Sequence, residues 1–212
     1  MPRLRCVPRA EVDPGVEKIY ALVFGDRDPV ADPGTATGTP GNWWTVFAGS
    51  PDVLLHAMAG FTLLNSATRK LSPALREVGL VRTGFLGGSR FVFSQHSKLA
   101  RAVGLSEERI AAIPTWSTSS VFDPAERAVL AYVDELVLAD GRVQDPTFAK
   151  LREHLSDEEI LELSYGVGTY RMHAMLSRAL RLEYDDVEEP VREVPAPAGF
   201  DPKSLATALR GK

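Results

Sequence analysis

The sequence has one cysteine, Cys6, among its 212 residues. A single cysteine cannot form a disulfide or a dithiol redox motif within one chain. Long apolar runs are also missing, and residues 1–5 lack the apolar core of a signal peptide. No basic run stands out, and 28 Asp and Glu against 24 Lys and Arg give a net charge of -4. We therefore expect a cytoplasmic protein that binds neither nucleic acid nor a membrane.

A strand pattern of alternating apolar and polar residues is absent over any convincing length, and no repeat of 20–50 residues is seen. Helix-start signals are frequent instead. Capping boxes begin at Asp123 and Ser156, and proline follows Ser72 at a first helical position. We predict an all-α protein with helices over residues 12–24, 51–64, 73–85, 89–104, 124–140 and 156–183, and shorter helices after Ser106 and Asp145.

The helical part is expected to form one domain over residues 1–184, with an N-terminal arm. Residues 25–41 are rich in Asp, Pro, Gly and Thr, so they predict a long, mobile loop that acts as a lid. Trp43 and Trp44 are expected at the end of this loop, before the second helix. Residues 185–212 predict an extended, proline-rich tail with a final turn near residues 204–209.

Two ionisable side chains stand at positions where helical periodicity predicts apolar ones. At roughly 100° per residue, Glu77 shares its face with Ala74, Leu80, Val81 and Gly84, and His96 shares its face with Val92, Phe93, Leu99, Ala100 and Val103. Other polar residues of these helices, Arg82 and Lys98 among them, are predicted on the outer faces. A carboxylate and an imidazole are costly to bury unless they are paired or used, so they indicate a functional site.

The segment Leu-Arg-Glu-Val-Gly-Leu-Val-Arg from residue 75 and the segment Phe-Val-Phe-Ser-Gln-His from residue 91 resemble the core of the carboxymuconolactone decarboxylase family. The superfamily also contains the alkylhydroperoxidase D-like (AhpD-like) proteins. The resemblance extends over about residues 43–184. It implies an AhpD-like antiparallel helical bundle that assembles as trimers or hexamers. It also implies a pocket between helices, close to the subunit contact.

The peroxidase branch of this superfamily has a Glu, then a Cys-x-x-Cys pair, then a His. Glu77 and His96 fall on the Glu and the His of that pattern, whereas Ser89 and Val92 fall on the two cysteines. Thiol peroxidation needs a thiolate and a resolving thiol, which serine and valine cannot provide. The resemblance therefore supports the fold and disfavours an AhpD-like peroxidase activity.

The remaining pair, Glu77 and His96, suits proton transfer. The sequence thus predicts a cofactor-free enzyme that decarboxylates or isomerises a small carboxylated or carbonyl substrate. No metal is expected, because no His-x-x-Glu or His-x-x-x-His pair occurs. The alternative is that Glu77 and His96 form a purely structural pair, in a protein that binds a ligand or forms an assembly without catalysing a reaction. The residues expected to line the substrate site are Trp43, Trp44, Ser89, Val92, Phe93, Tyr170 and His173.

Overall fold

The computed structural model describes residues 1–186 and 190–201. Within these ranges the chain forms nine α-helices and two 3₁₀ helices, and it contains no strand. The predicted all-α fold is therefore confirmed. The helices are α1 (Glu17–Phe24), α2 (Asn42–Phe47), α3 (Pro51–Leu64), α4 (Pro73–Leu86), α5 (Arg90–Ala102), α6 (Glu107–Ala112), α7 (Pro124–Leu138), α8 (Asp145–Arg152) and α9 (Asp157–Leu180), with 3₁₀ helices η1 (Arg9–Glu11) and η2 (Ile113–Thr118).

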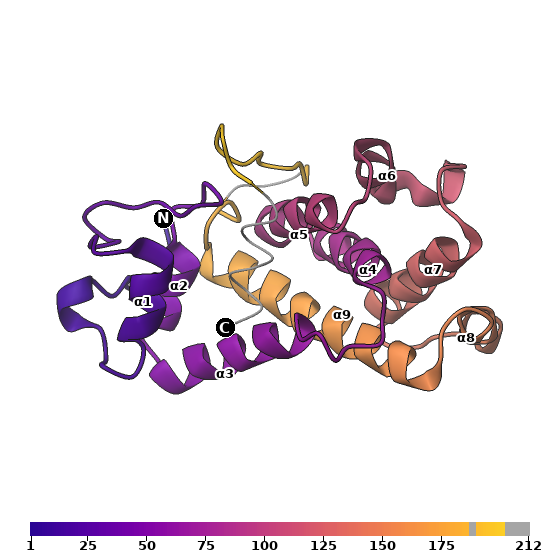
Figure 1. The fold of residues 1–212 in the computed structure, drawn as a ribbon, viewed down its shortest axis with the longest axis horizontal. Coiled ribbons are helices and arrows are strands. Elements are labelled where there is room, and N and C mark those ends of the chain that lie inside the picture. The colour runs from indigo at the N-terminus through magenta and orange to yellow at the C-terminus, as the bar shows by residue number, and fades with distance from the viewer. Residues whose placement is uncertain (187–189, 202–212) are drawn as a thin grey trace.

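The long helix α9 crosses the molecule and holds its two ends together. It passes between α3 and the hairpin of α4 and α5, with α1 and α2 at one end and α6 to α8 at the other (Figure 1). The larger apolar core is centred on α4, which packs against α5, α7 and α9. A smaller core around Tyr20, Trp43 and Phe47 joins α1, α2 and α3 to the end of α9. The α4–α5 hairpin is therefore enclosed from several sides.

The helix starts follow the capping signals in the sequence. Asp123 accepts a hydrogen bond from the Glu126 backbone N–H, and the Glu126 carboxylate accepts one from the Asp123 N–H. Ser156 and Glu159 form the same reciprocal arrangement at the start of α9. These bonds satisfy N–H groups that have no partner inside the helix. The predicted starts of α7 and α9 are correct.

Three predicted boundaries are wrong. Helix α1 begins at Glu17 rather than at residue 12, because the Asp13 carboxylate accepts a hydrogen bond from the Gly15 N–H in a tight turn. Trp43 lies in the short helix α2, not in a loop. Helix α9 ends at Leu180 instead of residue 183, because Arg181 has a left-handed backbone conformation with φ of 55°.

The predicted outer faces of α4 and α5 are also wrong for several polar residues. Arg82 is buried and binds both oxygens of Asp134 on α7, at 2.6 and 3.0 Å. Lys98 is buried beneath the segment 193–200. A helical wheel assumes one buried face, whereas α7, η2, α9 and the tail together surround this hairpin.

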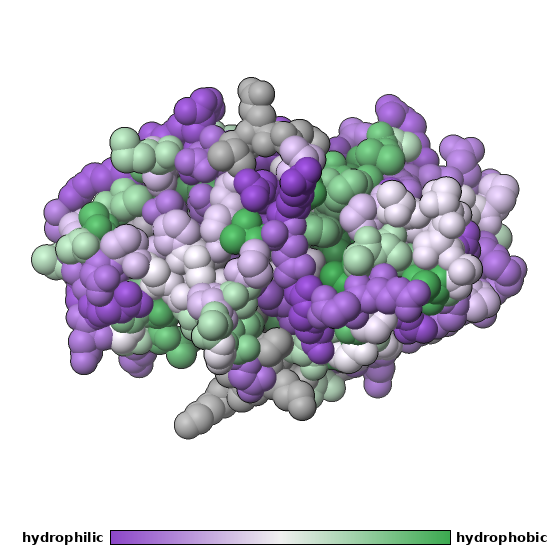
Figure 2. Space-filling view, turned by 90° about the horizontal axis from the view of Figure 1, so that it is seen from above, coloured by the Kyte–Doolittle hydropathy of each residue, from purple (hydrophilic) through white to green (hydrophobic). Residues whose placement is uncertain are grey.

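The described part of the tail, residues 185–186 and 190–201, contains no helix or strand, and Glu193 and Val194 bind side chains of α5. The turn predicted near residues 204–209 lies outside the described residues. Hydrophilic residues cover most of the face in Figure 2, and hydrophobic residues show between them as small patches. None of the helices in the described residues is long and apolar enough to cross a membrane.

Candidate active site between α4, α5 and α9

Glu77 on α4 and His96 on α5 form a buried pair. The distance from Glu77 Oε2 to His96 Nδ1 is 2.7 Å, and the two residues are 1% and 2% exposed. The close approach of the helices depends on Gly84, where an added Cβ would lie 2.6 Å from the Phe93 backbone nitrogen. Any side chain at this position would push the helices apart. The hairpin therefore positions the carboxylate against the imidazole.

Arg76 is the second partner of the Glu77 carboxylate. Its Nε donates to Glu77 Oε1 at 2.9 Å, and its guanidinium also donates to the Leu64 carbonyl at 2.6 Å. Burial by itself raises the pKa of Glu77, but the attraction and hydrogen bonds of His96 and Arg76 outweigh it and lower the pKa below its usual value. Glu77 is therefore an ionised acceptor for two donors.

Aromatic rings cover the His96 side of this pair. The Tyr170 ring on α9 meets the His96 ring edge-on, with 4.0 Å between centroids, and stacks on Phe61 at 6.1 Å. Trp43 and Phe61 both lie against the ring of His173, at 5.6 and 5.2 Å. Tyr170 and Phe61 are only partly buried, so they separate the pair from the surface of this chain.

Two groups in this aromatic layer have shifted pKa values. Burial, together with repulsion from His96, lowers the pKa of His173 to about 4. The Nδ1 atom of His173 has no hydrogen-bond partner among the described residues. Burial and the negative charge of Glu77 raise the pKa of Tyr170. At neutral pH, His173 is therefore uncharged and Tyr170 keeps its proton.

The predicted site residues divide into three groups. Trp43, Tyr170 and His173 join His96 in one aromatic cluster, and Trp44 contacts it through Trp43 at 4.9 Å. Val92 and Phe93 are buried near the start of α5, within the hairpin. Ser89 is engaged elsewhere.

Ser89 links the start of α5 to the segment after α9. Its Oγ accepts a hydrogen bond from the Val92 N–H at 3.1 Å and donates one to Asp185 Oδ2 at 2.5 Å. The Phe91 N–H also donates to Asp185. The hydroxyl at this position therefore has a structural contact on each side.

Sequence reasoning missed three polar residues that shape the site: Arg76, Glu183 and Asp185. Arg76 is about 100° from Glu77 on the helical wheel, yet its long side chain reaches back to the carboxylate. The Glu183 carboxylate accepts hydrogen bonds from the Trp43 and Gly41 N–H groups, at 2.6 and 3.1 Å. No sequence pattern predicts these contacts, which span 140 and 142 residues for Glu183.

Within residues 1–186 and 190–201, no group of three or more His, Cys, Asp or Glu side chains is placed to hold a metal ion.

Two comparisons relate the chain to known proteins. Residues 51–135, which include Glu77 and His96, match the carboxymuconolactone decarboxylase family. A crystal structure of a protein of unknown function from Agrobacterium tumefaciens, related by name to the antioxidant defence protein AhpD, is 26% identical. The match covers 69% of this chain and 96% of that one, with a TM-score of 0.56. These matches support the assignment of residues 51–135 to the carboxymuconolactone decarboxylase/AhpD-like superfamily.

Other relatives are more distant or match a shorter segment. The AhpD core of an uncharacterized peroxidase-related protein from Ralstonia eutropha JMP134 is 16% identical, with 89% and 98% of the two chains covered and a TM-score of 0.68. The debrominase Bmp8, in complex with 2,3,4-tribromopyrrole, is 15% identical over 99% and 98%, with a TM-score of 0.69. Both likenesses show the fold alone. Bacillus subtilis YdfG, an uncharacterized protein, is 29% identical over 89 residues, which are 42% of this chain and 60% of YdfG.

Proposed function

We propose that this protein is a cofactor-free acid–base enzyme that decarboxylates or isomerises a small carboxylated or carbonyl compound. The observation that carries the proposal is the buried 2.7 Å contact between Glu77 and His96. A carboxylate bound to Nδ1 fixes the ring orientation and makes Nε2 the nitrogen that exchanges a proton with substrate. Arg76 keeps Glu77 ionised, so Glu77 stabilises the imidazolium that forms.

The isomerisation needs two proton transfers. His96 Nε2 takes a proton from a carbon next to a carbonyl, and the electron pair of the broken C–H bond enters an enolate. The imidazolium then returns the proton to another carbon of the extended enolate, which restores the neutral ring. In a decarboxylation, the carbon–carbon bond to the carboxylate breaks instead, carbon dioxide leaves, and the electron pair of the broken bond enters a dienolate. A His96 imidazolium that has taken its proton from water protonates this dienolate and returns to the neutral ring. We expect substrate to reach His96 past Tyr170 and Phe61.

Assembly is part of the proposal. Leu161, Tyr165, Gly168, Met172 and Met175 are exposed and lie within an 80° stripe of α9 at roughly 100° per residue. A row of exposed apolar residues on one helix is typical of a subunit contact. We expect a trimer or a hexamer in which this stripe, called the α9 stripe below, is covered.

Proton transfer can be tested before the natural substrate is known. Enolisable ketones and β,γ-unsaturated carboxylic acids are incubated with the protein in D₂O, and NMR follows deuterium incorporation at carbon. Glu77→Gln and His96→Asn should each lower the exchange rate by about 10²-fold or more, while circular dichroism shows a folded protein. His154→Asn changes an exposed histidine far from the pair and should leave the rate unchanged.

The same variants test the non-catalytic alternative. A purely structural pair predicts that Glu77→Gln and His96→Asn lower the melting temperature and leave any exchange rate nearly intact. Exchange that is equally fast in both variants would refute the acid–base proposal. Absence of exchange for every compound in the wild-type protein would favour a ligand-binding or assembly protein.

A further inference from the structure

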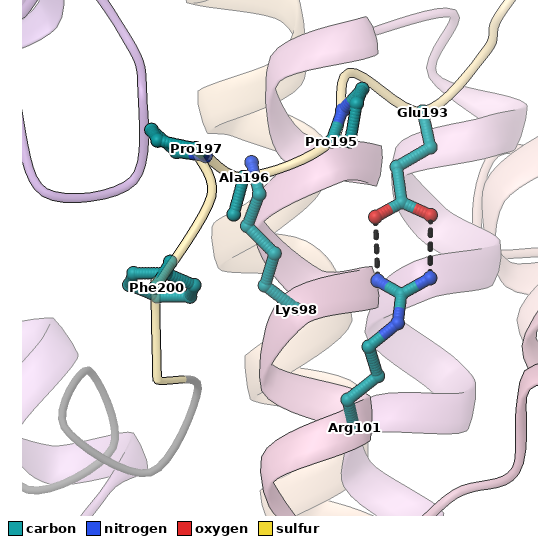
Figure 3. A pocket seen from close by; sticks show the side chains of 7 residues that line it. All are labelled: Lys98, Arg101, Glu193, Pro195, Ala196, Pro197 and Phe200. Carbon is teal, nitrogen blue, oxygen red and sulfur yellow. Dashed lines mark hydrogen bonds and ion pairs between the residues drawn. The ribbon is translucent and has the colours of Figure 1, made fainter.

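A cavity lies on α5, away from the Glu77–His96 pair. Its volume is about 550 Å³, and it is bounded by Lys98 and Arg101 on α5 and by residues 193–200 of the tail (Figure 3). His96 and Lys98 are two residues apart, so they point about 200° apart around the helix. A volume of this size is within the range of small-molecule sites. The cavity is therefore separate from the proposed active site.

Contacts that need no ligand hold the tail over this cavity. Arg101 binds both oxygens of Glu193, at 2.5 and 2.9 Å, and the Val194 N–H donates to the buried Ser94 hydroxyl at 2.9 Å. Farther along, Pro197 packs tightly on Gly38, where an added Cβ would lie 2.8 Å from the proline ring. The wall of the cavity is thus formed in advance.

Lys98 is the unusual group in this cavity. Its side chain points from α5 towards Ala196, as Figure 3 shows, and it is 2% exposed. Its Nζ atom has no hydrogen-bond partner among the described residues. Arg101, in contrast, has Glu193 and Glu107 as partners. A buried cation without a partner is costly, so it indicates a missing anion.

The surroundings of Lys98 also affect its protonation. Burial lowers the pKa of Lys98 to about 8; Glu193 opposes this shift and Arg101 adds to it. The ammonium form thus still predominates at neutral pH. An anion beside Nζ would raise the pKa again.

We propose that this cavity binds a small organic monocarboxylate. Its carboxylate pairs with Lys98 Nζ, and its apolar part lies against Pro195, Pro197 and Phe200. Among the described residues that line the cavity, Lys98 is the one cation without a carboxylate partner, and Glu193 lies nearby, so the site matches one negative charge and disfavours a dianion such as phosphate. This site goes beyond the proposed proton-transfer function and does not depend on it.

Benzoate tests the proposal, with benzamide as its neutral counterpart and inorganic phosphate as a simple anion. Isothermal titration calorimetry should show saturable binding of benzoate to the wild-type protein and at least tenfold weaker binding of benzamide and phosphate. Lys98→Met should weaken benzoate binding at least tenfold. Lys18→Met removes an exposed lysine on α1 and should leave it unchanged.

Several results would overturn the proposal. They are no saturable benzoate binding, equal binding of benzamide or of phosphate, and full affinity in Lys98→Met. Because Lys98 has no hydrogen-bond partner to lose within residues 1–186 and 190–201, Lys98→Met should melt no lower than the wild-type protein. If Lys98→Met does melt at a lower temperature, a measurement on the wild-type protein replaces it. NMR of the lysine side chains should then show that benzoate raises the pKa of Lys98 by at least one unit. An unchanged pKa would also overturn the proposal.

Discussion

Glu183 makes the stability of this protein depend on pH in a direction opposite to that of most carboxylates. The side chain follows α9, is 5% exposed, and accepts hydrogen bonds from the N–H groups of Trp43 and Gly41 at the start of α2. Burial raises its pKa to about 7, against the effect of these hydrogen bonds. We predict that Glu183→Gln removes this dependence.

The sign and size follow from the shift between the folded and unfolded chain. The pKa is 4.5 in the unfolded chain and about 7 in the folded one. Because the pKa of Glu183 is higher in the folded state, its contribution to the free energy of unfolding is fully present below pH 4.5. This contribution is lost as the pH rises through 7. Proton linkage gives a loss of about 2.5 kcal/mol between pH 5 and pH 8. Glutamine does not titrate, so the free energy of unfolding of the Glu183→Gln variant should lack this loss.

Urea unfolding at pH 5, 6, 7 and 8, at fixed protein concentration, measures the effect. Glutamine has one acceptor oxygen where Glu183 has two, so the variant loses a hydrogen bond at every pH. The informative quantity is therefore the change with pH: relative to wild type, the variant should gain about 2.5 kcal/mol from pH 5 to pH 8. Glu158→Gln, at an exposed carboxylate of α9, is the control. The reasoning would be refuted if the stability of Glu183→Gln relative to wild type stayed constant or fell from pH 5 to pH 8.

Four further outcomes are expected. Peroxide should not be consumed with a dithiol reductant; turnover that Cys6→Ser abolishes would contradict this. Light scattering should give a mass well above 23.1 kDa, and Leu161→Glu combined with Met175→Glu in the α9 stripe should reduce it to that of one chain; a monomeric wild-type protein would rule out the assembly. Because the pKa of His173 is lowered to about 4, the wild-type protein should lose stability as the pH falls from 6.5 through 4, and His173→Phe should lose less over this range in urea unfolding. Amide hydrogen exchange should be fastest in residues 25–41; exchange as slow as in α9 would exclude a mobile lid.

Local signals in the sequence were sufficient to predict most of the helices. The capping boxes at Asp123 and Ser156 are read within four residues, and the structure contains both. Proline at positions 51 and 73 begins α3 and α4 as predicted. Local hydrogen bonds determine these starts, so one sequence is enough to find them.

Contacts between distant segments could not be predicted in this way. Helix α2 has six residues, and Glu183 binds the N–H groups at its start across 140 residues or more. So short a helix has little stability of its own, because its first turns leave N–H groups unsatisfied. The burial of Lys98 is not predictable for the same reason, because the segment that covers it, residues 193–200, lies far along the chain from α5.

The candidate site combines the two kinds of information. Periodicity predicted that Glu77 and His96 are buried, and the structure adds that they touch. The resemblance placed Ser89 at a peroxidase cysteine, but only the structure shows its hydroxyl bonded to the Val92 N–H and to Asp185. A thiol is a weak donor and acceptor and would hold these two groups poorly. At Ser89 the chain therefore has a helix cap tied to the tail, whereas the Glu and His positions keep a contact suited to moving protons.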